Sequence, residues 1–526
     1  MKGSIILMIS ATAAKLLGVV FRIPLTNMLG GIGMGYFSCA YSLFMPIYAL
    51  TVTGISSAVA RLTAQSVALG MYSNVAKLRR EALILFTAVG LAGSMLILFL
   101  AKPFSLYFTG GTEAAAAVTL IAPSVLFGCI TAVERGYYEG MSNMYPTAVS
   151  QVAEGIIRTV AGLLLCSFVT AHPRTVLRLF SGVTDIRGAA AAAGILGVTL
   201  STAGAVLFFG IIRLFFRVPN GGEHHTMSSR AIAGELFFTA LPMGVSALVT
   251  NLTAIVDMWT VIWCISRFGS RIEAPTGISA SQLPHFIYGS FAGIALTVFS
   301  LVPSVTNMLG KGALTCIASA RESGDRKALE RGTVQALLTS TVIAVPSAAG
   351  IFVLSPQILG FLYPRQPDEA ALCVAPLRYL MAGMVCLCVS YPLFSMLQAV
   401  GKPAAPLKIM LVGTAVKLIF NLLLIPFMGV DGAALSTSVS YVFILTKALW
   451  IYIRASGVRL GFSHFGKVLY AGAMCGGSAY LTACAAERFE LPLFAIICGS
   501  AAVGGTVYLL FLRFLSASLK SCSCGD

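Results

Sequence analysis

Four basic residues lie near the middle of long apolar stretches of the sequence, namely Lys15, Arg22, Arg158 and Lys417. Each lysine or arginine at the centre of a lipid-facing helix costs about 2.5 to 3.5 kcal/mol on insertion scales, so four of them in lipid would cost on the order of 10 kcal/mol. We therefore expect them to line a shared, hydrated cavity and to bind the substrate there. Snorkelling to the headgroups explains Arg378 and Lys447, which lie nearer the ends of their stretches.

Two carboxylates accompany these cations. Glu154 precedes Arg158 by four residues, so the two share a helix face, and a local ion pair is the simplest account of them. Asp257 lies near the end of another apolar stretch, and two roles stay open for it: coupling transport to a cation, or neutralising one of the basic residues. Two acids and four bases leave a cationic surplus. Such a cavity favours an anion, for example a phosphate or pyrophosphate, and repels a cationic drug.

The composition places these residues in a membrane. Of 526 residues, 57% are apolar and only 10% are charged, whereas an average soluble domain has about 25% charged residues. The net charge of +16 fits the positive cytoplasmic loops that membrane insertion requires. No basic run is interleaved with aromatic residues as single-strand binding would need, so we expect no nucleic-acid partner.

Apolar stretches of about 20 residues recur along the whole chain and predict an all-α integral membrane protein with about 14 transmembrane helices. The predicted helix centres lie near residues 17, 48, 92, 126, 158, 202, 246, 295, 346, 385, 417, 442, 477 and 503. The first stretch continues to about Leu29, so we interpret it as an uncleaved membrane helix. Lysines and arginines, including the cluster Lys77, Arg79 and Arg80, concentrate in alternate loops. This bias predicts a multi-pass protein of the cytoplasmic membrane with both termini in the cytoplasm.

An internal repeat divides the chain. Residues 137–165 and 395–424 share a polar end, a short turn, a proline and an apolar helix with one basic residue. The spacing from Glu139 to Arg158 equals the spacing from Gln398 to Lys417. Because each repeat holds six helices, an even number, we expect two parallel copies that face each other.

The repeat and the polar gaps predict the domain organisation. We expect an N-terminal six-helix lobe at 1–220, a cytoplasmic linker at 221–230, and a C-terminal six-helix lobe at 231–455. Two additional transmembrane helices and a short tail follow at 456–526.

Four segments, in the same order along the chain, resemble one known family. They are Lys15-LLGVVF-Arg22 with LTNMLGGIGMGYF after it, QVAEGIIRTV around Arg158, SLVPSVTNMLGKG around Pro303, and LQAVGKPAAPLKIMLVGTAVKLIFNLLLIP with GVDGAALSTSVSY after it. These segments are similar to the stage V sporulation protein B branch of the multidrug/oligosaccharidyl-lipid/polysaccharide exporter superfamily, which stands alongside the MurJ-like lipid flippases.

This resemblance implies a flippase that moves an undecaprenyl-pyrophosphate-linked cell-wall or polysaccharide precursor from the inner to the outer leaflet by alternating access. It implies that Lys15 and Arg22 meet the pyrophosphate, and that the last two helices form a groove for the polyprenyl tail. The arginine pair of the MurJ second span is absent here, since only Arg61 lies nearby. A lipid-linked anionic glycan is therefore the implied partner, together with the lipid bilayer.

Two other functions stay open at this stage. A cation-coupled multidrug antiporter of the same superfamily would use Glu154 and Asp257 as coupling carboxylates, so a coupling ion is an open partner. A membrane-embedded transferase would need a paired-carboxylate metal motif, whereas the only adjacent histidines, His224 and His225, lie in the predicted linker. We therefore expect neither an enzyme nor a cofactor or metal site.

Overall fold

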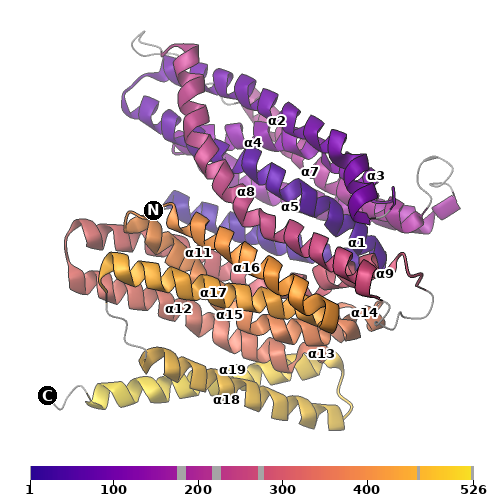
Figure 1. The fold of residues 1–526 in the computed structure, drawn as a ribbon. Coiled ribbons are helices and arrows are strands. Elements are labelled where there is room, and N and C mark those ends of the chain that lie inside the picture. Colours follow the sequence, from indigo (N-terminus) through magenta and orange to yellow (C-terminus); the bar gives the residue numbers. More distant parts are fainter. Residues whose placement is uncertain are drawn as a thin grey trace. The chain divides into compact units, whose positions relative to one another are not determined.

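The structure is a computed structural model that describes residues 2–109, 111–174, 185–215, 227–269, 278–458 and 463–522. The described residues form helices joined by short turns and contain no strand (Figure 1). The helices are α1 (Lys2–Ala68), α2 (Tyr72–Thr109), α3 (Ala115–Ile121), α4 (Pro123–Gly140), α5 (Tyr145–Ala171), α7 (Ile186–Phe215), α8 (Ser229–Phe268), α9 (Leu283–Ser290), η2 (Phe291–Ala295), α10 (Leu296–Phe299), α11 (Leu301–Glu322), α12 (Arg326–Val353), α13 (Ser355–Leu362), α14 (Pro367–Leu372), α15 (Val374–Ala399), α16 (Ala405–Met428), α17 (Val430–Ser456), α18 (Ser463–Arg488) and α19 (Leu493–Cys522). The predicted all-α fold is confirmed.

Helix α1 is two membrane spans rather than one. Its backbone leaves the helical conformation at Gly30, which has φ 63° and ψ −179°, a region that favours glycine. The rings of Phe21 and Phe37 lie 6.2 Å apart, although 16 residues of straight helix would separate them by about 24 Å. The chain therefore folds back at Gly30 into a first arm (residues 2–29) and a second arm (residues 31–68).

The number of spans in the described residues agrees with the predicted value of about 14. Twelve helices are long and apolar enough to cross a membrane when α1 is counted once, and the pair Leu283–Phe299 and Leu301–Asn307, bent by 45°, makes a thirteenth. The two arms of α1 raise the number by one. Each predicted centre lies inside one of these helices, because long apolar runs are the strongest signal that a membrane sequence carries.

The contacts divide the chain into two compact units. The first contains Met1–Arg267 and Thr276–Gly289, and the second contains Phe268–Pro275 and Ser290–Asp526. The predicted linker at 221–230 lies largely outside the described residues. Helix α8, which follows it, and nearly all of α9 belong by their contacts to the first unit, so that unit extends beyond the predicted N-terminal lobe. The parallel relation of the two lobes stays a prediction.

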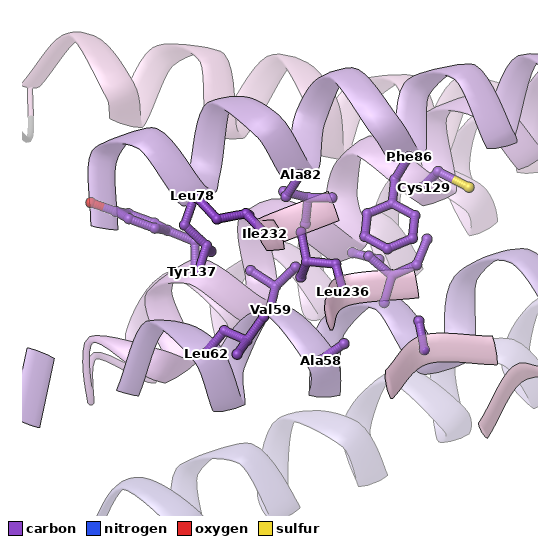
Figure 2. Packing of buried hydrophobic residues seen from close by; sticks show 14 of the residues in the cluster. Ala58, Val59, Leu62, Leu78, Ala82, Phe86, Cys129, Tyr137, Ile232 and Leu236 are labelled. Atoms are coloured by element: carbon purple, nitrogen blue, oxygen red, sulfur yellow. The ribbon is translucent and has the colours of Figure 1, made fainter. Parts of the chain in front are cut away.

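Close packing explains why α8 joins the first unit. Ile232 and Leu236 of α8 are buried in one apolar cluster with Val59, Leu78 and other residues of α1, α2 and α4 (Figure 2). A Cβ atom on Gly54 would lie 2.1 Å from the backbone oxygen of Ala240. Only a glycine at this position lets α8 approach the second arm of α1 so closely.

The hairpin of α4 and α5 in the first unit and the hairpin of α15 and α16 in the second unit correspond to the predicted repeat. A residue with positive φ closes each turn, Ser142 (59°) in the first and Gly401 (78°) in the second. Arg158 lies in α5 and Lys417 lies in α16. The repeat thus places one basic residue near the middle of the second helix of each hairpin.

The last two spans, α18 and α19, pack against each other and against α12 within the second unit. Val345, Val468, Cys475 and Tyr508 form a buried cluster there. The Tyr508 hydroxyl donates a hydrogen bond to the Val342 carbonyl oxygen over 2.9 Å. The predicted additional pair of helices is therefore attached to the second unit through α12.

Candidate functional site

A charged network joins α4 to α5 inside the first unit. The guanidinium of Arg135 donates to the Glu154 carboxylate over 2.8 Å and to the Ser150 hydroxyl over 3.0 Å. Both charged side chains are largely shielded from solvent. Glu154 therefore makes its ion pair with another helix, whereas the sequence favoured a local pair with Arg158. Arg135 was missed, although an arginine inside an apolar span is itself a signal.

Arg158 lies beside this pair. It interacts electrostatically with the Tyr41 hydroxyl, to which it also hydrogen-bonds, with the Glu154 carboxylate and with the Tyr48 hydroxyl. The second arm of α1 supplies the two phenols. The Nε atom of Arg158 is buried and has no hydrogen-bond partner among the described residues. The side chain thus adds a positive charge and an unused donor to a network whose only named carboxylate already binds Arg135.

A second polar cluster forms around Tyr288 of α9. Its hydroxyl lies 3.0 Å from the hydroxyl of Ser42, and both Arg22 and Asp257 lie within electrostatic range of it. The Asp257 side chain is buried, and Arg22 is half-buried. The fold thus brings the predicted residues Arg22 and Asp257 within electrostatic range of one phenol, and the two roles left open for Asp257 stay predictions.

The other two predicted basic residues lie apart from these clusters. Lys15 is exposed on the first arm of α1, two helical turns before Arg22. Lys417 belongs to the second unit, where it is buried with Thr414 and Asn421 on neighbouring turns of α16. Three of the four predicted cations therefore lie in the first unit and one in the second, and a cavity shared by all four stays a prediction.

A further buried ion pair was missed because its arginine was assigned to a cytoplasmic cluster. Arg79 of α2 is 7% exposed, and its Nε atom donates to the Glu134 carboxylate of α4 over 3.2 Å. The guanidinium also lies 4.4 Å from the ring centre of Tyr137, which adds a cation–π contact. Glu134 and Arg135 are adjacent in α4. Glu134 forms an ion pair with α2, and Arg135 forms one with α5.

Taken together, these features define a multi-pass membrane protein with basic polar clusters inside its helical units. Within the described residues, no group of three or more histidine, cysteine, aspartate or glutamate side chains could hold a metal ion. Arginine side chains with phenol and serine hydroxyls are suited to bind an anion by charge-assisted hydrogen bonds.

Comparison with known families agrees with this class. The family model described as "Polysaccharide biosynthesis protein" matches residues 1–270, just over half of the chain, and the chain belongs to this family. The model described as "MatE" matches residues 290–423. The resemblance to the exporter superfamily is confirmed.

Individual relatives cover most of the chain at low identity. The chain is 24% identical to "Lipid II flippase MurJ" of Bacillus subtilis (strain 168) over 84% of this chain and 80% of that protein. It is 24% identical to "Stage V sporulation protein B" of the same organism over 88% of this chain and 86% of that protein. The solved structure "Lipid II flippase MurJ, inward closed conformation" matches 98% of this chain and 99% of that chain with a TM-score of 0.67 and 17% identity. At this identity the structural match establishes the fold.

Proposed function

We propose that this protein is a flippase that moves an undecaprenyl-pyrophosphate-linked cell-wall or polysaccharide precursor from the inner to the outer leaflet by alternating access. The proposal rests on the family, on a relative named as a flippase, and on the chemistry of the first unit.

The positive surplus around Arg158 is the observation that carries the proposal. Arg135 and Arg158 flank a single carboxylate, Glu154, and Arg135 already binds it. A buried positive charge and an unused donor are unfavourable unless an acceptor arrives. A pyrophosphate supplies both negative charge and several acceptor oxygens, and arginine is the side chain that best matches that geometry.

Passage of the headgroup needs such compensation. A pyrophosphate in the apolar centre of a bilayer would carry a prohibitive desolvation penalty. Basic residues at several depths, such as Lys15, Arg22 and Arg158, would replace part of its hydration on the way. Exposure of this basic path first to one side and then to the other moves the headgroup without opening a continuous pore.

The test is reconstitution into liposomes that contain a fluorescent undecaprenyl-pyrophosphate-linked saccharide. Bleaching by a membrane-impermeant reductant measures how much precursor changes leaflet. Arg22→Ala removes a charge-assisted contact worth about 1.5 to 3 kcal/mol, so flipping should fall about tenfold or more. Arg22→Lys should recover part of the rate, because the charge stays while the bidentate geometry is lost. Lys408→Ala, an exposed position on α16, is the matched control and should flip normally.

One rival function has an observation in its favour. The buried carboxylate of Asp257 and the MatE match suit a cation-coupled multidrug antiporter. In that case Arg22→Ala would leave dye efflux intact or improve it, because a repulsive charge is removed, and Asp257→Asn would abolish efflux. Unchanged flipping in Arg22→Ala together with lost efflux in Asp257→Asn would replace our proposal by this one.

A further inference from the structure

An aromatic cavity of about 500 Å³ lies within the first unit, away from the charged network. Its aromatic lining comes from Trp259 and Trp263 of α8 and from Tyr107 and Phe108 at the end of α2. The volume is in the range of ordinary small-molecule sites. The cavity therefore has the size and the flat apolar surfaces of a ligand pocket.

The polar side chains that the described residues contribute to the lining are uncharged. Ser266 and Ser281 contribute hydroxyls and His285 contributes an imidazole, and none of the described lining residues is a lysine, arginine, aspartate or glutamate. A phosphate would find no strong counter-charge among these residues. A neutral ligand with both apolar faces and many hydroxyl groups fits this lining, and a sugar ring has these properties.

Trp450, the third tryptophan of the chain, has the surroundings of a membrane-interface anchor and differs in this from Trp259 and Trp263. Trp450 of α17 packs against the cations of Lys447 and Arg454, at 5.4 and 5.5 Å, as expected for an aromatic residue at the headgroup level. Trp259 and Trp263 instead lie 6.3 Å apart, one helical turn after the other, and line a hollow. Anchoring alone does not account for them.

Helix α9 connects the pocket to the cluster around Arg22. His285 lines the pocket, and its ring centre lies 5.1 Å from that of Tyr36, with the two rings tilted by 41°. Tyr288 follows three residues later, on the same helix face, and lies within electrostatic range of Arg22. His285 of the pocket and Tyr288 of the Arg22 cluster are thus about one helical turn, roughly 5 Å, apart along α9. A sugar bonded directly to a pyrophosphate would span that distance.

We propose that this pocket binds the sugar residues of the lipid-linked glycan next to its pyrophosphate. The inference rests on the proposed flippase function and adds a glycan-recognition site to it. The pocket lies at the C-terminal ends of α2 and α8. Both helices begin on the side of the membrane where the N-terminus is predicted to lie, so both end on the other side. With the predicted orientation, these ends face the outside, where the glycan is delivered.

Intrinsic fluorescence tests binding without transport. The chain has three tryptophans, so Trp450→Phe leaves Trp259 and Trp263 as the only indole reporters. We expect saturable emission changes when N,N′-diacetylchitobiose or maltose is added to this variant in detergent, and no change when inorganic pyrophosphate is added. Absence of any saccharide response would overturn the proposal. Saturable quenching by tetraphenylphosphonium alone would overturn it too and would assign the pocket to cationic drugs.

Transport tests the role of the site. Trp259→Ala with Trp263→Ala should raise the KM for flipping of a saccharide-bearing precursor about tenfold, because tryptophans at the centre of a site carry much of its binding energy. Flipping of sugar-free undecaprenyl pyrophosphate should stay unchanged. Trp259→Phe with Trp263→Phe keeps the packing and should recover part of the loss, and Trp450→Ala is the matched control. An equal loss with both lipids would overturn the inference, whereas a saccharide response in protein that flips neither lipid would sustain the pocket and refute the flippase.

Discussion

The α4–α5 hairpin of the first unit and the α15–α16 hairpin of the second unit have the same backbone plan and different charges. In the first, Arg135 and Glu154 form an ion pair beside Arg158. The spacing of the repeat aligns these partners with Phe394 and Gly413. The second hairpin thus keeps the central basic residue, Lys417, without the ion pair.

Packing explains part of this difference. A Cβ atom on Gly413 would lie 2.5 Å from Cγ1 of Ile444 in α17, so the second unit has no room for a glutamate where the first has Glu154. Elsewhere the second unit uses neutral partners: the hydroxyls of Thr333 and Tyr452 meet at 2.7 Å in its core. The first unit uses Arg79 and Glu134 to join its helices. The comparison teaches that a repeat can preserve helices and a central cation while only the first hairpin carries an arginine–glutamate pair between its two helices.

The largest expected effect is the loss of one partner of the buried ion pair in the first unit. Glu134→Ala leaves the Arg79 cation buried and uncompensated, which should destabilise the protein by about 3 to 5 kcal/mol. Thermal unfolding in detergent measures the change. Replacement of both Arg79 and Glu134 by leucine should recover much of the stability. If Glu134→Ala is as stable as the parent, the buried ion pair does not hold the helices of the first unit together.

Disturbing the close contact between α1 and α4 in the first unit should cause the next largest loss of stability. A Cβ atom on Gly136 would lie 2.4 Å from the Ser56 carbonyl oxygen, and a backbone atom cannot move aside cheaply. We expect Gly136→Ala to destabilise the protein by about 1 to 3 kcal/mol in the same assay. Gly210→Ala is the control, because nothing lies within 4 Å of that Cβ position. Similar results for both variants would show that α1 and α4 are not closely packed.

The central basic residues test whether the two hairpins share a function. Arg158→Ala and Lys417→Ala should each reduce precursor flipping about tenfold, since each removes one charge-assisted contact to the headgroup. Arg158→Ala leaves the ion pair of Arg135 and Glu154 in place, so unfolding temperature should change little. Lys408→Ala should retain full activity. If only Arg158→Ala reduces flipping, headgroup binding is restricted to the first unit.

The smallest expected effect belongs to the neutral contact of the second unit. Thr333→Val removes the hydroxyl that meets Tyr452 and preserves side-chain volume. A neutral hydrogen bond contributes about 1 kcal/mol, so the loss of stability should be several times smaller than that of Glu134→Ala. A loss as large as that of Glu134→Ala would show that hydroxyl contacts and buried charges stabilise the two units equally.

Sequence reasoning found the spans and the cost of charges inside them, and it failed on partners. It assigned Arg79 to a cytoplasmic cluster because that residue lies close to Lys77 and Arg80, only seven positions after the start of α2. It considered only Arg158 as a partner for Glu154 because those two residues share a helix face. Arg135 and Glu134 reach their partners across helix interfaces, and no local pattern encodes which helices are neighbours.

The sequence by itself determined the membrane class, the number of spans and the repeat of the two hairpins. These follow from local quantities, since an apolar run of about 20 residues forms a helix in lipid whatever its neighbours are. Tertiary structure decided which residues meet: Glu154 with Arg135, Asp257 and Arg22 around Tyr288, and α8 against the first unit. These contacts depend on close packing at positions such as Gly54, which is set by the shapes of two helices together rather than by either one alone.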